Sequence, residues 1–179
     1  MIEGRNSTFE IDKNFQTPLN VAAHMAAMIP VDAISIFEPT PGEGNLLSVL
    51  SKTQYKITAA DDFFLFPKTE RYDCILMNPP FSSKSAFMDN APEGAEIKGM
   101  KVGYYILKQC MNMSDNLIAL MPWYTISDSD VRMRYLKSFG IKSLTYLSRK
   151  TFQYARIQTV IIELEKGYNK DTTFKIFNY

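Results

Sequence analysis

The stretch DCILMNPPFSS, residues 73–83, has the pattern of a buried strand that ends in a rigid polar tip. Residues 73–77 are mostly apolar, as expected of a strand covered on both faces. Asn78 and Pro79 each precede a proline, which holds both residues extended. Because proline has no N–H, the tip presents two acceptors, the Asn78 side-chain oxygen and the Pro79 carbonyl, beside the ring of Phe81.

Two acceptors beside an aromatic ring fit a planar substrate that carries an NH₂ group. The two oxygens accept the amino hydrogens while the substrate ring stacks on Phe81. The nitrogen lone pair then faces an electrophile, and the carbonyl dipoles and the π face stabilise positive charge on nitrogen. The tip formed by Asn78, Pro79, Pro80 and Phe81 is therefore predicted to prepare an amino nitrogen for attack. The alternative is a proline-terminated strand with a buried Phe81.

A glycine-containing loop, FEPTPGEGN at residues 37–45, lies between a predicted strand and a predicted helix. Gly42 and Gly44 can adopt torsions closed to other residues and allow the backbone to approach a ligand. The loop lacks the Lys-Ser/Thr of a phosphate loop, so nucleoside triphosphate binding is not expected. Glu38 would repel a pyrophosphate and favours a cationic or hydroxyl-bearing ligand.

The expected elements alternate between strands and helices. Helices are predicted over residues 18–28, 45–51, 100–113 and 129–139, strands over 33–38, 55–60, 73–77, 116–121, 141–147 and 159–165, and a short edge strand over 173–177. Thr17 is expected to cap the first helix, with Pro18 in its first turn, and residues 82–99 are expected to form a polar loop. This order predicts an α/β domain with a largely parallel sheet. Ligands bind beyond the carboxyl ends of such strands, so Glu38 and Asn78 should share one cleft.

The chain has 179 residues, 46% of them hydrophobic, which suits one well-packed domain over residues 15–179 after a tail at 1–14. Residues 2–5, Ile-Glu-Gly-Arg, match an engineered protease site and are set aside. No window has the length of a membrane span and no secretory signal is recognised. Cys74 and Cys110 have neither metal-ligand spacing nor a disulfide framework. We therefore expect a reduced, cytoplasmic protein without a metal.

Charge is unevenly distributed although the net charge is only +1. Residues 1–127 carry a net charge of −4, and residues 128–158 carry a net charge of +5. A basic segment can contact phosphate. On charge alone, however, a solvated helix and loop is the favoured interpretation of this segment.

Five stretches follow one another in a set order: FQTPLNVAAHM (15–25), FEPTPGEGN (37–45), DDFF (61–64), NPPF (78–81) and TFQYARIQTVIIELEKG (151–167). In this order they resemble the amino-nitrogen methyltransferases that use S-adenosylmethionine, most closely the DNA adenine-N6 methyltransferases. The resemblance covers about residues 15–167 and implies a Rossmann-like methyltransferase fold. It also implies S-adenosylmethionine as cofactor.

The resemblance assigns roles to individual residues. The methionine part of the cofactor would be held by the loop residues Glu38, Pro39, Gly42, Gly44 and Asn45, with Thr17 and Pro18 closing over that part. The ribose and adenine of the cofactor would contact Asp61, Asp62 and Phe63. The target base would be held by Asn78, Pro79, Pro80 and Phe81. His24 is expected to be structural. Trp123 either walls the base pocket or belongs to the core.

Two departures from the family pattern stand out. Only one strand is predicted between the glycine loop and NPPF, where the family has two, so one strand–helix unit is expected to be missing. Asp61 and Asp62 would then share two roles, or simply cap the next turn. No separate target-recognition region is evident, so a specificity subunit or a second copy of the chain would supply specificity.

The function implied by the resemblance is methylation of the exocyclic amino group of adenine in DNA, as in restriction–modification. The target base would have to flip out of the duplex to reach the cleft. RNA and protein glutamine are alternative substrates, because the same tip can orient any planar NH₂ group. Phe81 in place of tyrosine, and the missing N-terminal helical domain, argue against the glutamine enzymes. A degenerate, non-catalytic subunit is the third alternative.

Overall fold

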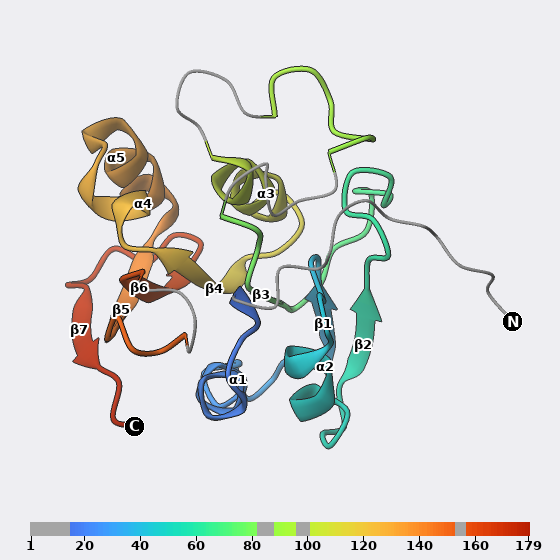
Figure 1. Ribbon diagram of the computed structural model, residues 1–179, viewed down its shortest axis with the longest axis horizontal. Helices are drawn as coiled ribbons and strands as arrows, with labels where there is room; N and C mark the ends of the chain where they lie inside the picture. The colour runs from blue at the N-terminus through green and yellow to red at the C-terminus, as the bar shows by residue number, and fades with distance from the viewer. Residues whose placement is uncertain (1–14, 82–87, 96–100, 153–156) are drawn as a thin grey trace, which may run out of the picture.

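One seven-stranded sheet organises the protein (Figure 1). The computed structural model describes residues 15–81, 88–95, 101–152 and 157–179. The strands are β1 (Ser35–Glu38), β2 (Lys56–Ala59), β3 (Cys74–Met77), β4 (Asn116–Pro122), β5 (Ile141–Leu147), β6 (Thr159–Glu165) and β7 (Thr173–Ile176). Their order is β2-β1-β3-β4-β6-β5-β7, with β6 antiparallel to both of its neighbours and the other pairs parallel. The α/β fold class is therefore confirmed.

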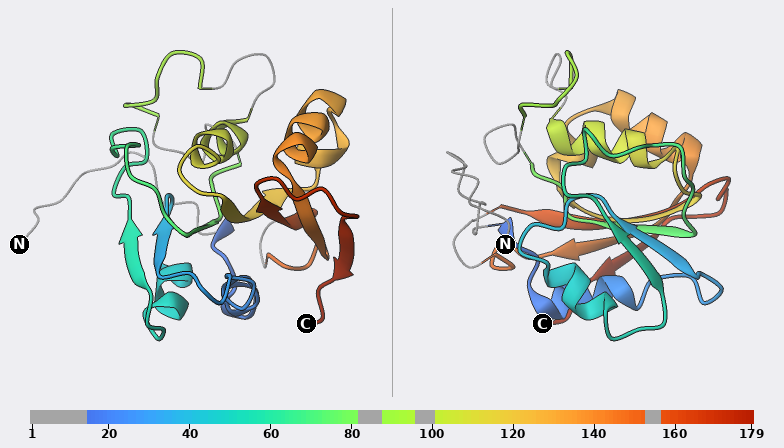
Figure 2. Two further views of the ribbon diagram at one scale, coloured as in Figure 1. Left: turned by 180° about the vertical axis from the view of Figure 1, so that it is seen from behind. Right: turned by 90° about the vertical axis from the view of Figure 1, so that its right-hand side faces the viewer.

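Helices cover both faces of the sheet, as the edge-on view in Figure 2 shows. The helices α1 (Leu19–Ala26) and α2 (Asn45–Leu50) lie on one face, and α3 (Val102–Cys110), α4 (Tyr124–Ser127) and α5 (Asp130–Phe139) lie on the other. Within the described ranges, none of the helices has both the length and the apolar composition needed to cross a membrane.

The side chains of β3 explain why the sequence of this central strand is a continuous run of apolar residues. Cys74 and Leu76 belong to the hydrophobic cluster under α1 and α2, whereas Ile75 and Met77 belong to the cluster under α3 and α5. All four residues are buried, because successive side chains point to opposite, covered faces. The strand therefore has no polar face, and its sequence lacks the alternation of a half-exposed strand.

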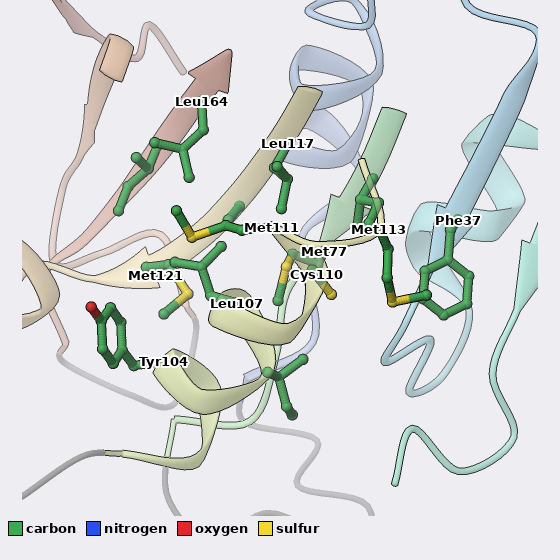
Figure 3. Close-up of a cluster of buried hydrophobic side chains, with 14 of the residues drawn as sticks. Phe37, Met77, Tyr104, Leu107, Cys110, Met111, Met113, Leu117, Met121 and Leu164 are labelled. Atoms are coloured by element: carbon green, nitrogen blue, oxygen red, sulfur yellow. The ribbon is translucent and has the colours of Figure 1, made fainter. Parts of the chain in front are cut away.

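The cluster under α3 is rich in sulfur (Figure 3). Met111, Met113 and Met121 gather with Cys110 and Leu107 between α3 and the strands. Methionine is unbranched and flexible, so it fills the irregular gaps that a helix leaves over a twisted sheet.

Residues 60–73 replace the missing strand–helix unit. As predicted, these residues contain no helix or strand between β2 and β3; the sheet nevertheless has seven strands, because β7 adds to its opposite edge. Aromatic rings cover the exposed end of the core instead: Phe66 and Tyr72 stack on Phe37 with ring centroids 4.7 Å and 4.9 Å away. The shortened half is therefore closed by side chains from a loop.

Thr17 does not cap the first helix. The helix begins at Leu19, Pro18 occupies the capping position, and no side chain there accepts a hydrogen bond from the helix. The prediction fails because Thr17 has a tertiary partner, described below. The short helix α4 was not predicted, whereas Ser129 caps α5 through the Arg132 N–H and Gly140 ends that helix as expected.

We predict that Phe66→Ala lowers the free energy of unfolding by about 1–3 kcal/mol, because it removes a partly buried ring from Phe37. Leu65→Ala is the matched control, since Leu65 is exposed in the same loop, and it should stay within about 0.5 kcal/mol of the wild type. Urea unfolding measures both. Equal effects would contradict the covering role of Phe66.

Candidate functional site

Residues 15–17 cross the carboxyl end of the sheet and bind the NPPF tip. The Asn78 Nδ2 group donates to the Phe15 carbonyl at 2.8 Å and to the Thr17 Oγ1 at 3.0 Å. Thr17 is buried. Thr17, which was expected to cap the first helix, thus helps to fix the orientation of the Asn78 amide.

The Asn78 Oδ1 atom is left buried without a hydrogen-bond partner in the described structure. Both Nδ2 hydrogens are already used, so this oxygen is the atom with spare capacity to accept. A buried polar atom without a partner is destabilising unless a ligand or water satisfies it. The tip therefore holds a preoriented acceptor, as the sequence predicted.

Three aromatic rings gather at the tip. Phe81 is 6% exposed, and its ring centroid lies 5.4 Å from that of Phe15 and 6.4 Å from that of Phe152. Phe15 and Phe152 are 5.9 Å apart, and all three contacts are edge-to-face. Sequence reasoning missed Phe15 and Phe152 as site residues, although both lie within the stretches that carry the resemblance.

The glycine loop packs against the same crossing segment. Gly42 has φ +55°, and a Cβ there would lie 2.7 Å from the Gln16 Oε1 atom. That oxygen accepts from the Glu43 N–H at 3.0 Å, and the Asn45 Nδ2 group donates to the Thr17 carbonyl at 2.9 Å. Residues 15–17 therefore join the glycine loop to the NPPF tip.

Glu38 ends β1 and is 0% exposed. Its Oε1 accepts from the Thr40 N–H at 3.0 Å, whereas its Oε2 is buried without a partner in the described structure. Burial raises the pKa of Glu38 to about 8, and the Thr40 hydrogen bonds only partly oppose that shift. β1 and β3 are parallel neighbours, so Glu38 and Asn78 both lie at the carboxyl end of the sheet; a cleft shared by the two residues stays a prediction.

Asp62 is held by two hydrogen bonds. Its Oδ1 accepts from the Phe64 N–H and its Oδ2 accepts from the Asn90 side chain, both at 2.8 Å. Asp61 is exposed. The bond to Phe64 matches the turn-capping alternative. The bond to Asn90 ties this turn to residues 88–95, which are the described part of the predicted polar loop.

Phe63 lies in the core rather than on an open surface. It is 4% exposed, and the Lys68 ammonium lies 4.6 Å from its ring centroid. Lys68 also donates to the carbonyls of Phe63 and Phe66, at 2.7 Å and 2.8 Å, and partial burial lowers the pKa of Lys68. Stacking of Phe63 on a ligand adenine stays a prediction that requires this turn to rearrange.

The other face of the tip is backed by α3, α4 and α5. A Cβ at Gly103 would lie 2.7 Å from the Pro80 carbonyl oxygen, so glycine allows α3 to approach the tip. The Tyr124 hydroxyl donates to the Phe81 carbonyl at 3.3 Å, and the Arg132 guanidinium donates to the Tyr124 carbonyl at 3.0 Å. Sequence reasoning missed these backing residues because they lie 22 to 51 positions beyond Phe81.

The remaining candidates take structural positions. Pro39 is buried after β1, and His24 packs edge-on against Phe177 with centroids 5.1 Å apart. The Trp123 side chain is partly buried at the margin of the core, and its ring lies edge-on to the ring of Tyr146. Arg156, one of the basic residues of segment 128–158, lies outside the described residues. Among those that are described, no cluster of three or more His, Cys, Asp or Glu could hold a metal.

We predict that Glu38 makes stability depend on pH. Its folded pKa of about 8 lies above the ordinary 4.5, so the free energy of unfolding should fall as pH rises from 4.5 to 8 and then level off. The effect is at most about 5 kcal/mol, since one pKa unit is about 1.4 kcal/mol. Glu38→Gln should remove this slope in urea unfolding at several pH values. Glu43→Gln, an exposed change in the same loop, is the control.

Comparison with known proteins finds no matching family model and no matching curated protein. Solved structures do match. A type I restriction–modification methyltransferase subunit from Streptococcus thermophilus aligns over 91% of this chain and 47% of its own, with 18% identity and a TM-score of 0.69. A candidate class I S-adenosylmethionine-dependent methyltransferase from Listeria monocytogenes aligns over 99% and 68%, with 16% identity and a TM-score of 0.70.

A candidate RNA methyltransferase from Pyrococcus horikoshii aligns over 85% of this chain and 87% of its own, with 16% identity and a TM-score of 0.55. The chain spans about half the length of the type I subunits that it matches. At these identities the likeness establishes the fold. The chain has the Rossmann-like fold of class I S-adenosylmethionine-dependent methyltransferases.

Proposed function

We propose that the chain transfers a methyl group from S-adenosylmethionine to the exocyclic amino group of adenine in DNA. The observation that carries the proposal is the buried, unpartnered Asn78 Oδ1, held at the carboxyl end of β3 beside an aromatic cluster. This atom is positioned to accept an amino hydrogen.

The residues on the β1 side fit the cofactor. Glu38 offers a buried carboxyl oxygen without a partner, which a ligand ammonium or hydroxyl would satisfy. Gly44 has a positive φ and open space beside its Cα, so a ligand can approach the backbone there, whereas the corresponding side of Gly42 is occupied by Gln16. Asp61 and Asp62 follow β2 at the same end of the sheet. When bound, S-adenosylmethionine supplies an electrophilic methyl group.

The residues on the β3 side orient the amino nitrogen. Asn78 Oδ1 and the Pro79 carbonyl accept its two hydrogens, and the ring of Phe81 stacks on the base. These acceptors turn the nitrogen lone pair out of conjugation and stabilise positive charge on nitrogen, so no strong general base is required. Phe15 and Phe152 lie against Phe81, so their rings would form the wall of the space that the base enters. The Phe15 ring must move aside before the base can stack fully on the Phe81 ring.

DNA is the proposed substrate because of the likeness to the type I subunit. A base inside a duplex cannot reach a recessed acceptor, so the adenine would be flipped out. The basic residues of segment 128–158 would contact phosphate, and a specificity subunit or a second copy would read the sequence. RNA is the second candidate substrate, favoured by the likeness to the Pyrococcus protein.

Cofactor binding gives the first test. We expect calorimetry to detect S-adenosylhomocysteine binding that weakens about tenfold or more in Asp62→Ala, because a charge-assisted hydrogen bond is lost. Asp32→Ala is the matched control, since Asp32 is exposed near the amino ends of the strands. Absence of binding to the wild-type chain at millimolar ligand would overturn the proposal.

Methyl transfer gives the second test. Radiolabelled transfer to DNA, RNA and protein, followed by nucleoside analysis, should yield N6-methyladenine in DNA. Asn78→Ala should lower turnover about 100-fold or more, by analogy with removal of one group that stabilises developing charge. Asn112→Ala, an exposed change at the far end of α3, should leave turnover unchanged. Label in RNA alone would select the second candidate, and label in neither nucleic acid would reject both.

A further inference from the structure

The turn that follows β5 presents Phe152 to the candidate site. Phe152 is buried, and its ring lies edge-on to both Phe81 and Phe15. Residues 148–152 lie between β5 and β6 and form no helix or strand. The position of Phe152 relative to Phe81 therefore depends on how this turn is held.

The turn is closed by its own hydrogen bonds. The Ser148 carbonyl accepts from the Thr151 N–H at 3.1 Å and from the Thr151 hydroxyl at 2.7 Å. The Ser148 hydroxyl accepts from the Lys150 N–H at 3.2 Å. These bonds fix the shape of the turn, but they do not attach it to the sheet.

Tyr179 attaches the turn from outside. Its hydroxyl oxygen accepts from the Ser148 N–H at 2.7 Å and lies 2.5 Å from the Thr151 Oγ1. Since the Thr151 hydroxyl hydrogen is directed to Ser148, the Tyr179 hydroxyl donates to Thr151. The Ser148 N–H, the Thr151 hydroxyl hydrogen and the Tyr179 hydroxyl hydrogen thus each have one acceptor, which is the arrangement of a specific contact.

Strand β7 delivers Tyr179 to this place. β7 pairs in parallel with β5 at the sheet edge, and the Phe177 N–H donates to the Tyr146 carbonyl at 2.9 Å (Figure 1). Phe177 is buried and packs edge-on against both His24 of α1 and Tyr179, with centroids 5.1 Å and 5.0 Å away. Residues 173–179 thus run from the sheet edge to the turn. They lie beyond residues 15–167, which carry the sequence resemblance.

We propose that Tyr179 is a positioning residue for substrate: its hydroxyl holds the turn at residues 148–151, and the turn holds Phe152 beside Phe81. The inference rests on the proposed function, because it assigns Phe152 to the wall of the base site. The Tyr179 residue is 66% exposed. Its hydroxyl can therefore be removed with little loss of buried area, whereas the two bonds to the turn are lost directly.

The test compares Tyr179→Phe with Tyr168→Phe. The control removes a similar hydroxyl, which bonds to the Asp171 carbonyl at 3.1 Å in the connection between β6 and β7. In methyl-transfer assays, Tyr179→Phe should raise KM for the nucleic acid about three- to tenfold, the usual effect of losing a modest hydrogen bond. The dissociation constant of S-adenosylhomocysteine should not change. Tyr168→Phe should match the wild type in both.

A second measurement does not depend on activity. With 4-fluorophenylalanine placed at position 152, the ¹⁹F NMR signal should be single in the wild type and in Tyr168→Phe. The signal should broaden or split in Tyr179→Phe. Thr151→Val should reproduce that change, because it removes the Thr151 hydroxyl to which the Tyr179 hydroxyl donates. Unchanged ¹⁹F spectra and KM would overturn the positioning role and leave the proposed function intact. If the wild type methylates none of the substrates, the proposed function fails. In that case the ¹⁹F spectra still test the positioning role, which is overturned if the spectrum of Tyr179→Phe equals that of the wild type.

Discussion

The carboxyl-end surface of the protein depends on the hydrogen bonds between the Asn78 amide and residues 15–17. Two prolines make the tip rigid, but rigidity alone leaves the amide free to rotate. The Phe15 carbonyl and the Thr17 hydroxyl remove that freedom, and the Thr17 carbonyl accepts a hydrogen bond from Asn45 at the end of the glycine loop. One short segment thus aligns the two halves of the site.

The half of the domain around β1 and β2 shows how a class I methyltransferase sheet can lose a strand–helix unit. The exposed end of the core still has to be covered, and the rings of Phe66 and Tyr72 cover it by stacking on Phe37. The same loop carries Asp62 and buries Phe63 under Lys68. One turn therefore covers the core and also carries the carboxylates that we propose to bind the cofactor.

Elements whose signals are local were predicted well. The buried run of β3, the helix predicted over residues 129–139 and the strands β5 and β6 follow from periodicity and short-range chemistry, which neighbouring residues determine. Thr17 was misplaced because its hydroxyl has a partner 61 positions away, which outweighs its local capping preference. Phe63 was expected at a ligand; it lies in the hydrophobic core of the described structure, and its contact with a ligand stays a prediction.

The sequence by itself determined the fold class, the missing unit and the identity of the acceptor tip, because apolar periodicity and proline chemistry act over a few residues. Only the tertiary structure decided that Asn78 Oδ1 has no partner, that Glu38 is buried with a raised pKa, and that Phe15 and Phe152 meet Phe81. These properties depend on which distant residues exclude water from a group and which donate to it. Only chain folding brings such residues together.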